Sequence, residues 1–282
     1  MGILDGLGNL GLGNLQKMDV YEEKKEQEQE TQTAKKEEKK FDESSVLLDK
    51  SEECPVCGAK FKSKHVRSGR FKAVGSDTDL RPKYQPLDVL KYDAVVCPAC
   101  GYAALSRFFK FMMPSYEKAI KENISANWQG MEPTGDFYTY DDAITQHKLA
   151  LANTIVKGAK DSEKAYTCLK LAWLYRGKAE TLEPTAENYE AQLKEAKAQE
   201  KEFLENAYAG FVNAYSTEDF PMCGMDELTV TYLLAELARR AGKLDEASRF
   251  VSTVLTNRNA SDRIKERARD VKEMIMKAKE GK

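Results

Sequence analysis

Two short segments of the form C-P-x-C-G constrain the fold of this chain more than any other feature. In each segment, proline presets the backbone of the turn, and the trailing glycine permits a positive φ just after the second sulfur. Two such turns can present four thiolates to one metal ion, and four thiolates leave no coordination position open for catalysis. We therefore predict a structural metal site whose ligands are Cys54, Cys57, Cys97 and Cys100.

Zinc is the expected metal. Iron in a rubredoxin-like site is the alternative, because ligand softness and geometry do not separate the two. Residues 58–96 separate the two turns, a longer gap than the common zinc-ribbon spacing of about 15–20 residues. Loop closure costs only about 0.6 kcal/mol per doubling of length, whereas structural zinc contributes about 10–16 kcal/mol in zinc-finger peptides. The gap is therefore compatible with one shared ion.

The composition limits the classes of function. The chain has 282 residues, of which 41% are hydrophobic, and its formal net charge is −2. Such a chain can bury a core, and so small a net charge creates no global field that attracts nucleic acid or a membrane. No apolar run is long enough to span a bilayer, and the N-terminus lacks a secretion signal. Six cysteines, four of them assigned to a metal, favour a reducing compartment, so we predict a cytoplasmic protein.

The first half of the chain divides into two regions. Residues 1–40 hold the repeat GLGNLGLGNL and then a charged linker, and we expect a disordered N-terminal tail. Residues 1–20 of this tail are a candidate docking motif that acts in cis or in trans, with incidental leucines or a weak membrane-surface contact as the alternatives. Residues 41–112 contain both cysteine turns and are predicted to form a small β-rich, zinc-ribbon-like module, with strands near 46–48, 71–74 and 93–96.

Residues 113–282 have the apolar periodicity of helices, which we expect to begin at Pro114 and then to cover 139–158, 161–180, 185–217, 226–241, 244–256 and 260–279. Around Gly242, large and small apolar residues stand at the offsets of a tetratricopeptide hairpin, namely Leu234, Ala235, Leu244, Ala247 and Val251. The predicted fold is therefore mainly α, with the β-rich module followed by a tetratricopeptide-like helical array. The aromatic candidates for lining the groove of this array are Tyr175, Tyr208, Phe211, Tyr215 and Tyr232, and the sequence does not decide which of them face inward.

A resemblance to a known family is carried by five segments, CPVCG, FKSKHVRSGR, SDTDLRPKY, YDAVVCPACGYAAL and LAWLYR. In these segments the chain resembles a family of bacterial proteins of unknown function, and the resemblance covers roughly residues 42–280. It implies a two-knuckle metal module joined to tetratricopeptide-like helices, and a bacterial origin. It implies no reaction.

The segment between the cysteine turns, residues 58–96, carries nine basic and four acidic side chains. Two interpretations stay open for it: an arginine–carboxylate network that braces the metal module, and a binding surface for an acidic peptide or a phosphate. Tyrosines beside basic residues are also typical of proteins that stack on single-stranded bases. The candidate residues for a binding surface are Arg67, Arg70, Asp77, Asp79 and Tyr84.

Two histidines and two further cysteines are the remaining candidates for metal binding or catalysis. His65 is not needed as a ligand when four sulfurs are present, and His147 on a predicted helix is expected to be a surface or packing residue. Cys168 is expected to be a small buried residue, and Cys223, in a loop between helices, to be exposed and oxidisable. Two histidines provide little for a nucleophile relay, and no glycine-rich phosphate loop precedes a helix.

The sequence therefore predicts a non-enzymatic, metal-stabilised scaffold or adaptor whose helical array binds a partner protein or peptide. The alternative is a nucleic-acid-binding protein that uses the basic segment between the cysteine turns. A thiol-redox enzyme is a third hypothesis, which would require metal-free, titratable cysteines.

Overall fold

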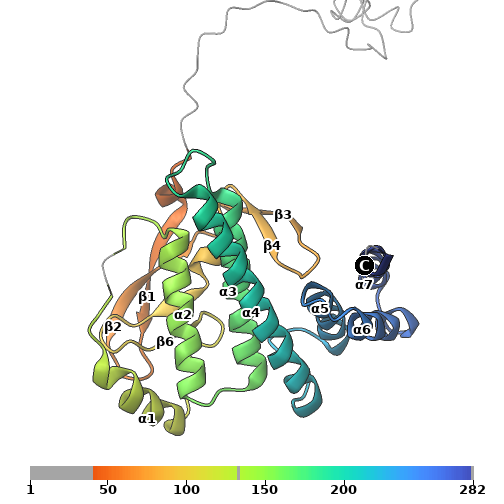
Figure 1. Ribbon diagram of the computed structural model, residues 1–282. Coiled ribbons are helices and arrows are strands. Elements are labelled where there is room, and N and C mark those ends of the chain that lie inside the picture. The colour runs from red at the N-terminus through yellow and green to blue at the C-terminus, as the bar shows by residue number, and fades with distance from the viewer. Residues whose placement is uncertain (1–40, 132–133, 281–282) are drawn as a thin grey trace, which may run out of the picture. The chain divides into compact units, whose positions relative to one another are not determined.

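The computed structural model describes residues 41–131 and 134–280 (Figure 1). The predictions made for the N-terminal tail and its docking motif lie outside the described residues. The described part is mainly α-helical with small antiparallel sheets, as the sequence predicts. None of its helices is both long and apolar enough to cross a membrane.

Three antiparallel hairpins form the β structure of the described residues. Their strands are β1 (Leu47–Glu53) with β2 (Lys60–Val66), β3 (Lys72–Ser76) with β4 (Pro82–Gln85), and β5 (Ala94–Val96) with β6 (Ala103–Leu105). Short 3-10 helices precede the first and third hairpins, η3 (Glu43–Val46) and η4 (Val89–Tyr92). The first strand of each pair overlaps a strand expected from the sequence, whereas the second strands were not predicted.

Each cysteine turn is the connection of one hairpin. The first turn joins β1 to β2, and the second joins β5 to β6. A hairpin brings the two ends of its connection together, so each turn holds its two sulfurs close to one another. The β3–β4 hairpin lies between them in the sequence and carries no cysteine.

Seven α-helices lie in the described residues, close to the expected bounds: α1 (Pro114–Asn123), α2 (Tyr140–Val156), α3 (Asp161–Thr181), α4 (Tyr189–Thr217), α5 (Glu227–Arg240), α6 (Leu244–Thr256) and α7 (Asp262–Glu280). A 3-10 turn, η5 (Ser125–Asn127), follows α1. Pro114 is the first residue of α1, as expected, because a missing N–H costs nothing there. Gly242, with a φ of +76°, ends α5 and lets the chain turn into α6.

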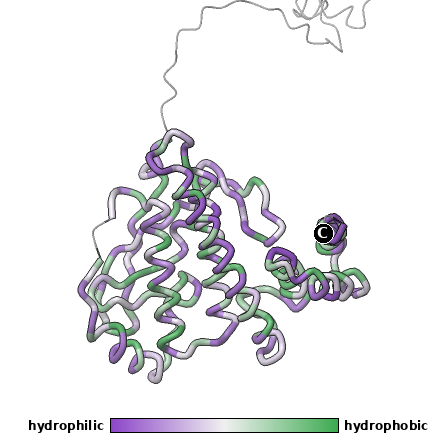
Figure 2. The backbone as a smooth tube through the Cα atoms, in the orientation of Figure 1, coloured by the Kyte–Doolittle hydropathy of each residue, from purple (hydrophilic) through white to green (hydrophobic). Residues whose placement is uncertain are grey.

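The helical core is built around α3, which packs along α4 on one side and against α2 on another. Leu169, Leu171, Ala172 and Leu174 of α3 are fully buried. Helix α5 then packs against α4 and α6, and α7 packs against both α5 and α6. Along the tube of Figure 2 the hydrophobic colour recurs at intervals on the helices, as expected for helices that bury one face.

The β-rich module packs directly on the helices. Strands β5 and β6 contact α2, and Leu90 of η4 belongs to the core of the helices. A second apolar cluster surrounds the cysteines and includes Tyr102, Phe109 and Ile120 of α1. The domain boundary between residues 112 and 113 stays a prediction. Residues on both sides of it, such as Phe109 and Ile120, belong to the same buried apolar cluster.

The prediction that the aromatic candidates line an open groove is wrong for three of the five. Tyr208, Phe211 and Tyr232 are at most 3% exposed and lie in the helical core, because burial of a large ring removes much apolar area from water. Tyr215 is half-buried and makes edge contacts with two phenylalanines. Tyr175 stacks on Phe203 and borders a groove between α2, α3 and α4.

Candidate metal centre

The two turns bring the sulfurs of Cys54, Cys57, Cys97 and Cys100 together, within 4.8 Å of one another. The Sγ atoms of Cys54 and Cys100 are 3.6 Å apart, and those of Cys57 and Cys97 are 3.7 Å apart. A tetrahedron with Zn–S bonds of about 2.3 Å has an edge of about 3.8 Å. A disulfide would bring two sulfurs to about 2.05 Å. The separations therefore fit a four-thiolate metal site and exclude a disulfide.

The backbone of the two turns is the same. In the first, Gly58 N–H donates to the Cys54 carbonyl at 2.9 Å, and in the second, Gly101 N–H donates to the Cys97 carbonyl at 3.0 Å. Both glycines have a φ close to +73°, a conformation that glycine adopts without strain. The first cysteine of each turn also donates its N–H to a residue beyond the turn, Ala59 or Tyr102. These bonds fix the direction of both sulfurs.

The surroundings of the two turns differ. Cys57 is exposed, and a Cβ on Gly58 would meet nothing within 4 Å. By contrast, a Cβ on Gly101 would lie 2.6 Å from the ring of Trp128, whose Nε1 donates to the Pro98 carbonyl at 2.9 Å. Trp128 therefore covers the second turn.

Helix α2 holds the second turn from the other side. Asn153 is fully buried, and its Nδ2 donates to the Gly101 carbonyl at 3.2 Å. Tyr102, also fully buried, follows the turn and donates its hydroxyl proton to the Phe109 carbonyl. The second turn is thus built into the body of the protein. Trp128 and Asn153 were not predicted as its partners, because both are distant from it along the chain.

Burial makes the thiolate form of two of the four cysteines unfavourable when no cation is bound. Burial raises the pKa of the Cys54 thiol well above its ordinary value and that of Cys100 to about 11. At Cys57 burial acts in the same direction, but hydrogen bonds from the Ala59 backbone and the neighbouring thiols outweigh it and lower the pKa. Four thiolates at these distances repel one another, so a divalent ion at their centre would stabilise them. The four residues therefore fit a metal ion.

Neither histidine lies in the sulfur cluster. His65 is on β2, where its Nε2 lies 2.9 Å from Ser63 Oγ and 3.6 Å from Glu52 Oε1. A catalytic triad needs the carboxylate on the opposite ring nitrogen from the serine, so this arrangement is not a nucleophile relay. His147 is fully buried, in agreement with a packing role, and its Nδ1 donates to the Ala143 carbonyl at 2.7 Å.

The two remaining cysteines have no metal partner among the described residues. Cys168 is buried, as predicted, and burial raises the pKa of its thiol to about 12. Cys223 is half-buried, and its Sγ donates to the Ser162 carbonyl at 3.3 Å. Burial raises the pKa of Cys223 to about 12 as well, which disfavours the thiolate that an oxidisable cysteine needs.

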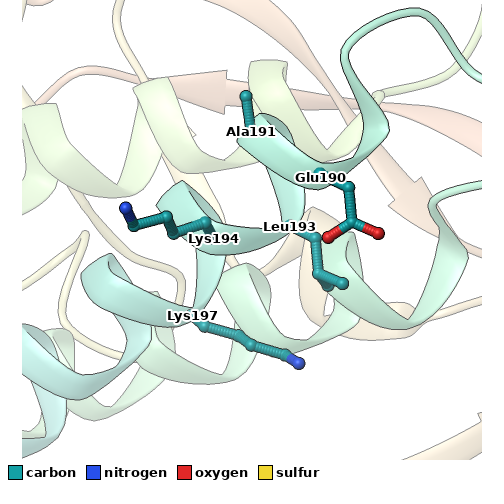
Figure 3. A pocket seen from close by; sticks show the side chains of 5 residues that line it. All are labelled: Glu190, Ala191, Leu193, Lys194 and Lys197. Atoms are coloured by element: carbon teal, nitrogen blue, oxygen red, sulfur yellow. The ribbon is translucent and has the colours of Figure 1, made fainter.

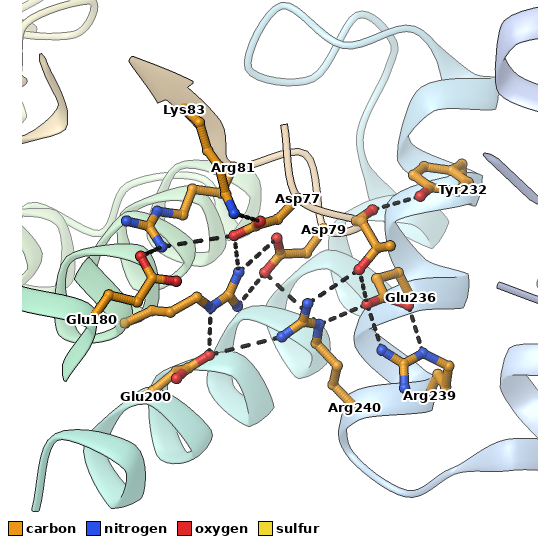
Figure 4. A network of polar contacts seen from close by, with 12 residues as sticks. Asp77, Asp79, Arg81, Lys83, Glu180, Glu200, Tyr232, Glu236, Arg239 and Arg240 are labelled. Atoms are coloured by element: carbon orange, nitrogen blue, oxygen red, sulfur yellow. Dashed lines mark hydrogen bonds and ion pairs between the residues drawn. The ribbon is translucent and has the colours of Figure 1, made fainter. Parts of the chain in front are cut away.

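The acidic residues singled out in the sequence face the helices (Figure 4). Asp77 and Asp79 lie in the turn between β3 and β4, and both accept hydrogen bonds from the guanidinium of Arg176 on α3. Burial alone would raise the pKa of Asp79, but the hydrogen bonds and charge of Arg176 outweigh it, so the pKa is lowered. These two aspartates therefore take part in an arginine–carboxylate network.

The other three candidate residues lie elsewhere. Arg67 and Arg70 are exposed in the connection between β2 and β3, at the opposite end of β3 from Asp77. The Nε of Arg67 donates to the Leu47 carbonyl. Tyr84 on β4 packs edge-on against Phe71. The structure does not bring these three residues onto the aspartates, and a binding role for them stays a prediction.

Part of the basic segment is neutralised by nearby carboxylates. Arg81 lies within ion-pair distance of Asp77, Asp88 and Glu180. Two lysines of the segment are paired as well, Lys83 with Asp77 and Lys91 with Glu43. On the β1–β2 hairpin, Lys60 and Lys64 stand directly opposite Glu53 and Asp49. The local excess of positive charge is therefore less available to phosphates than the sequence suggests.

The surface cavities do not add a second candidate centre. One cavity, of about 480 Å³, is lined by five residues that all belong to the first turns of α4, Glu190, Ala191, Leu193, Lys194 and Lys197 (Figure 3). A hollow bordered by one helix has no second wall to position a ligand. Another, of about 330 Å³, lies between α6 and α7 and is lined by four apolar side chains and five polar or charged ones.

Comparisons with known proteins place the chain in a family. No curated protein and no solved structure matches it significantly. A family of uncharacterised proteins conserved in bacteria (DUF2225) matches residues 47–275, a span that holds all four cysteines, the β3–β4 turn and helices α1 to α6 with most of α7. The match agrees with the bacterial family of unknown function that the sequence resembles. The chain therefore belongs to this family of uncharacterised bacterial proteins.

Proposed function

We propose that the protein is a non-enzymatic adaptor, which folds its β-rich module around one structural zinc ion and binds a partner protein through its helices. The observation that carries the proposal is the cluster of four sulfurs within 4.8 Å of one another. Four protein ligands complete the coordination of zinc, whereas catalytic zinc sites keep one position open. The metal in this proposal stabilises the fold and takes no part in a reaction.

The remaining polar side chains support the same conclusion. Five surface cavities of the described part, with volumes of about 240 to 480 Å³, have linings without histidine or cysteine. The serine–histidine contact on β2 lacks the geometry of a relay, and His147 is enclosed in the core. A binding role is therefore better supported than a catalytic one.

The helices support a tetratricopeptide-like array. Helices α5 and α6 are joined by a short turn at Gly242 and pack against one another, with Ala235 and Ala247 both fully buried. Small residues at these positions let the two helices approach closely. Helix α7 packs on both, as the next helix of such an array would. Arrays of this type bind extended segments of partners on one face.

The test is affinity capture with the tagged full-length protein in its native host, performed with and without nuclease treatment. We expect one protein partner that is retained after nuclease treatment. Loss of every protein partner after nuclease, with recovery of RNA or DNA, would refute the adaptor function and favour the basic segment.

Charge-reversal variants sharpen this test. Lys62→Glu with Arg70→Glu changes the exposed basic segment, and Lys194→Glu with Lys197→Glu changes the charge of the α4 surface by the same amount. The adaptor function predicts that the first pair leaves the captured protein unchanged. A nucleic-acid-binding protein should lose affinity with the first pair and keep it with the second, and its binding should weaken steeply with salt.

A further inference from the structure

The tip of the β3–β4 hairpin, Ser76–Arg81, consists of the last residue of β3 and the five-residue turn before β4, and it is held by helices that are far from it in the sequence. Both strands of its hairpin are largely exposed, and the hairpin forms a sheet of its own. The turn itself is closed by two backbone bonds, from Asp77 N–H to the Arg81 carbonyl and from Leu80 N–H to the Asp77 carbonyl. The contacts of the hairpin with α3, α5 and α7 are therefore concentrated at its tip.

Helix α3 binds the carboxylates of this turn. The guanidinium of Arg176 donates to both oxygens of Asp79, at 3.0 and 2.5 Å, and to Asp77 at 2.8 Å. Asp79 is fully buried. A bidentate arginine–carboxylate pair is specific for the position and plane of the carboxylate. The Nε of Arg176 is held in turn by Glu200 of α4, which fixes the guanidinium in this orientation.

Helix α5 binds the residue between the two aspartates. The hydroxyl of Thr78 donates to Glu236 at 2.6 Å, and the Thr78 carbonyl accepts from the hydroxyl of Tyr232 at 2.5 Å (Figure 4). Arg240 donates to the Thr78 hydroxyl at 3.1 Å, so both the side chain and the backbone of Thr78 are recognised. Glu236 is fully buried and accepts from Arg239 as well.

Helix α7 binds the start of the turn. Arg267 donates to the Ser76 hydroxyl at 2.5 Å. Four successive side chains are therefore bound by three helices: Ser76 by α7, Asp77 and Asp79 by α3, and Thr78 by α5. Leu80 has a φ of +69°, a left-handed conformation that leucine disfavours and that the surrounding contacts must maintain.

We propose that this surface of α3, α5 and α7 is a peptide clamp, which holds the chain's own Ser76–Arg81 turn and accepts in its place an acidic turn of a partner. The proposal rests on the adaptor function above and names the partner's chemistry. This acidic turn has one carboxylate on each side of a hydroxyl residue, because Arg176 binds the two carboxylates and α5 binds the hydroxyl and the backbone. The chain's own turn competes at a high effective concentration and lowers the apparent affinity for the partner.

The test uses the full-length protein and a fluorescein-labelled peptide with the sequence of residues 74–83. A control peptide carries Asn in place of both Asp residues. The variant Thr78→Ala with Asp79→Asn weakens the hold on the chain's own turn and leaves the helices intact. We expect this variant to bind the acidic peptide at least about tenfold more tightly than the wild type does, and the control peptide to bind neither. Adding Arg176→Ala should abolish binding.

A measurement on the wild type keeps the proposal falsifiable if this variant does not fold. At saturating peptide, amide hydrogen exchange should accelerate in the Ser76–Arg81 turn, because the turn is displaced, and should slow in α5 around Glu236. Unchanged exchange in the turn, or equal binding of both peptides, would overturn the clamp. If a protein partner is still captured and the Arg176→Ala variant captures it equally well, the clamp fails and the adaptor function stands. If no partner is captured, both fail.

Discussion

The two cysteine turns have nearly the same sequence and backbone, yet they occupy different environments. The first is exposed at Cys57, and its glycine faces open space. The second is enclosed by Trp128 on one side and Asn153 of α2 on the other. A shared motif therefore specifies the sulfur geometry, and the surrounding chain decides how strongly each turn is tied to the body. A metal ion bound by both turns would fasten the β1–β2 hairpin to the helices through the second turn.

Loss of the metal should have the largest effect, because it removes the link between the two turns. We expect Cys97→Ser to lose the bound metal and most of the roughly 10–16 kcal/mol that a structural zinc ion contributes to folding, so that the β-rich module unfolds. Limited proteolysis and circular dichroism detect the unfolding, and elemental analysis gives the metal content. Cys168→Ala is the matched control, since it is buried outside the cluster and should keep the metal. Equal metal content in both variants would contradict the assignment.

Alanine in place of each glycine compares the two turns directly. Gly58→Ala and Gly101→Ala place a Cβ on backbones with the same φ, which costs about 1–2 kcal/mol in either case. Gly101→Ala also drives a Cβ to 2.6 Å from Trp128, and such overpacking costs about 1–3 kcal/mol more. Chemical denaturation should show Gly101→Ala as the less stable variant. Equal losses would show that Trp128 does not cover the second turn.

The helix beneath the second turn predicts a pH dependence. Burial lowers the pKa of His147 to about 4, because the effect of burial outweighs the charge of Asp93, which raises the pKa. The charge of Asp88 also raises the pKa, and the charge of Lys170 lowers it. Because the unfolded chain binds a proton that the folded protein excludes, stability should fall as pH decreases below about 6.5, by about 2 kcal/mol at pH 5. Denaturation of the wild type and of His147→Gln between pH 5 and 7.5 measures this.

The variant should show a flatter pH dependence, since it lacks the titrating group. His65, on β2 at the end of its hairpin opposite the first turn, is the comparison, because burial lowers its pKa too but the residue is partly exposed. His65→Gln should therefore change the pH dependence less than His147→Gln does. The reverse order would contradict the difference in burial between His147 and His65.

The hydrogen bond from α2 to the second turn is a single contact, so its loss should have a smaller effect than loss of the metal or Gly101→Ala. Asn153→Ala leaves the buried carbonyl of Gly101 without this donor, which should cost about 1–3 kcal/mol. It should also speed the release of zinc to a chelator, because the turn becomes less constrained. Release followed with a chromogenic chelator measures the rate. A rate equal to that of the wild type would indicate that the turn is held by its own backbone alone.

The cysteine cluster and the helices could be predicted from the sequence because both are local signals. The C-P-x-C-G segments identify their sulfurs, and apolar periodicity gives the helix bounds to within a few residues. Strand β2 was missed because its alternating lysines resemble a solvated segment. In the structure those lysines form one face, and Phe61, Ser63 and His65 form the other.

The supporting contacts were not predictable because they join distant positions. Thr78 and Glu236 are 158 residues apart, and Trp128 reaches back 30 residues to Pro98. Such pairs depend on how the hairpins pack on the helices, and no periodicity or spacing in one sequence records that. Ser162 in the first turn of α3 likewise donates from its N–H and its hydroxyl to Glu218, which follows α4 and is 56 residues away.

We propose that one metal ion joins the two turns through four sulfurs. The most direct measurement is X-ray absorption at the metal edge on the purified full-length protein, together with elemental analysis. We predict one zinc ion per chain with four sulfur neighbours at about 2.3 Å. A protein free of metal that carries four titratable thiols, or a metal with fewer than four sulfur neighbours, would contradict the claim.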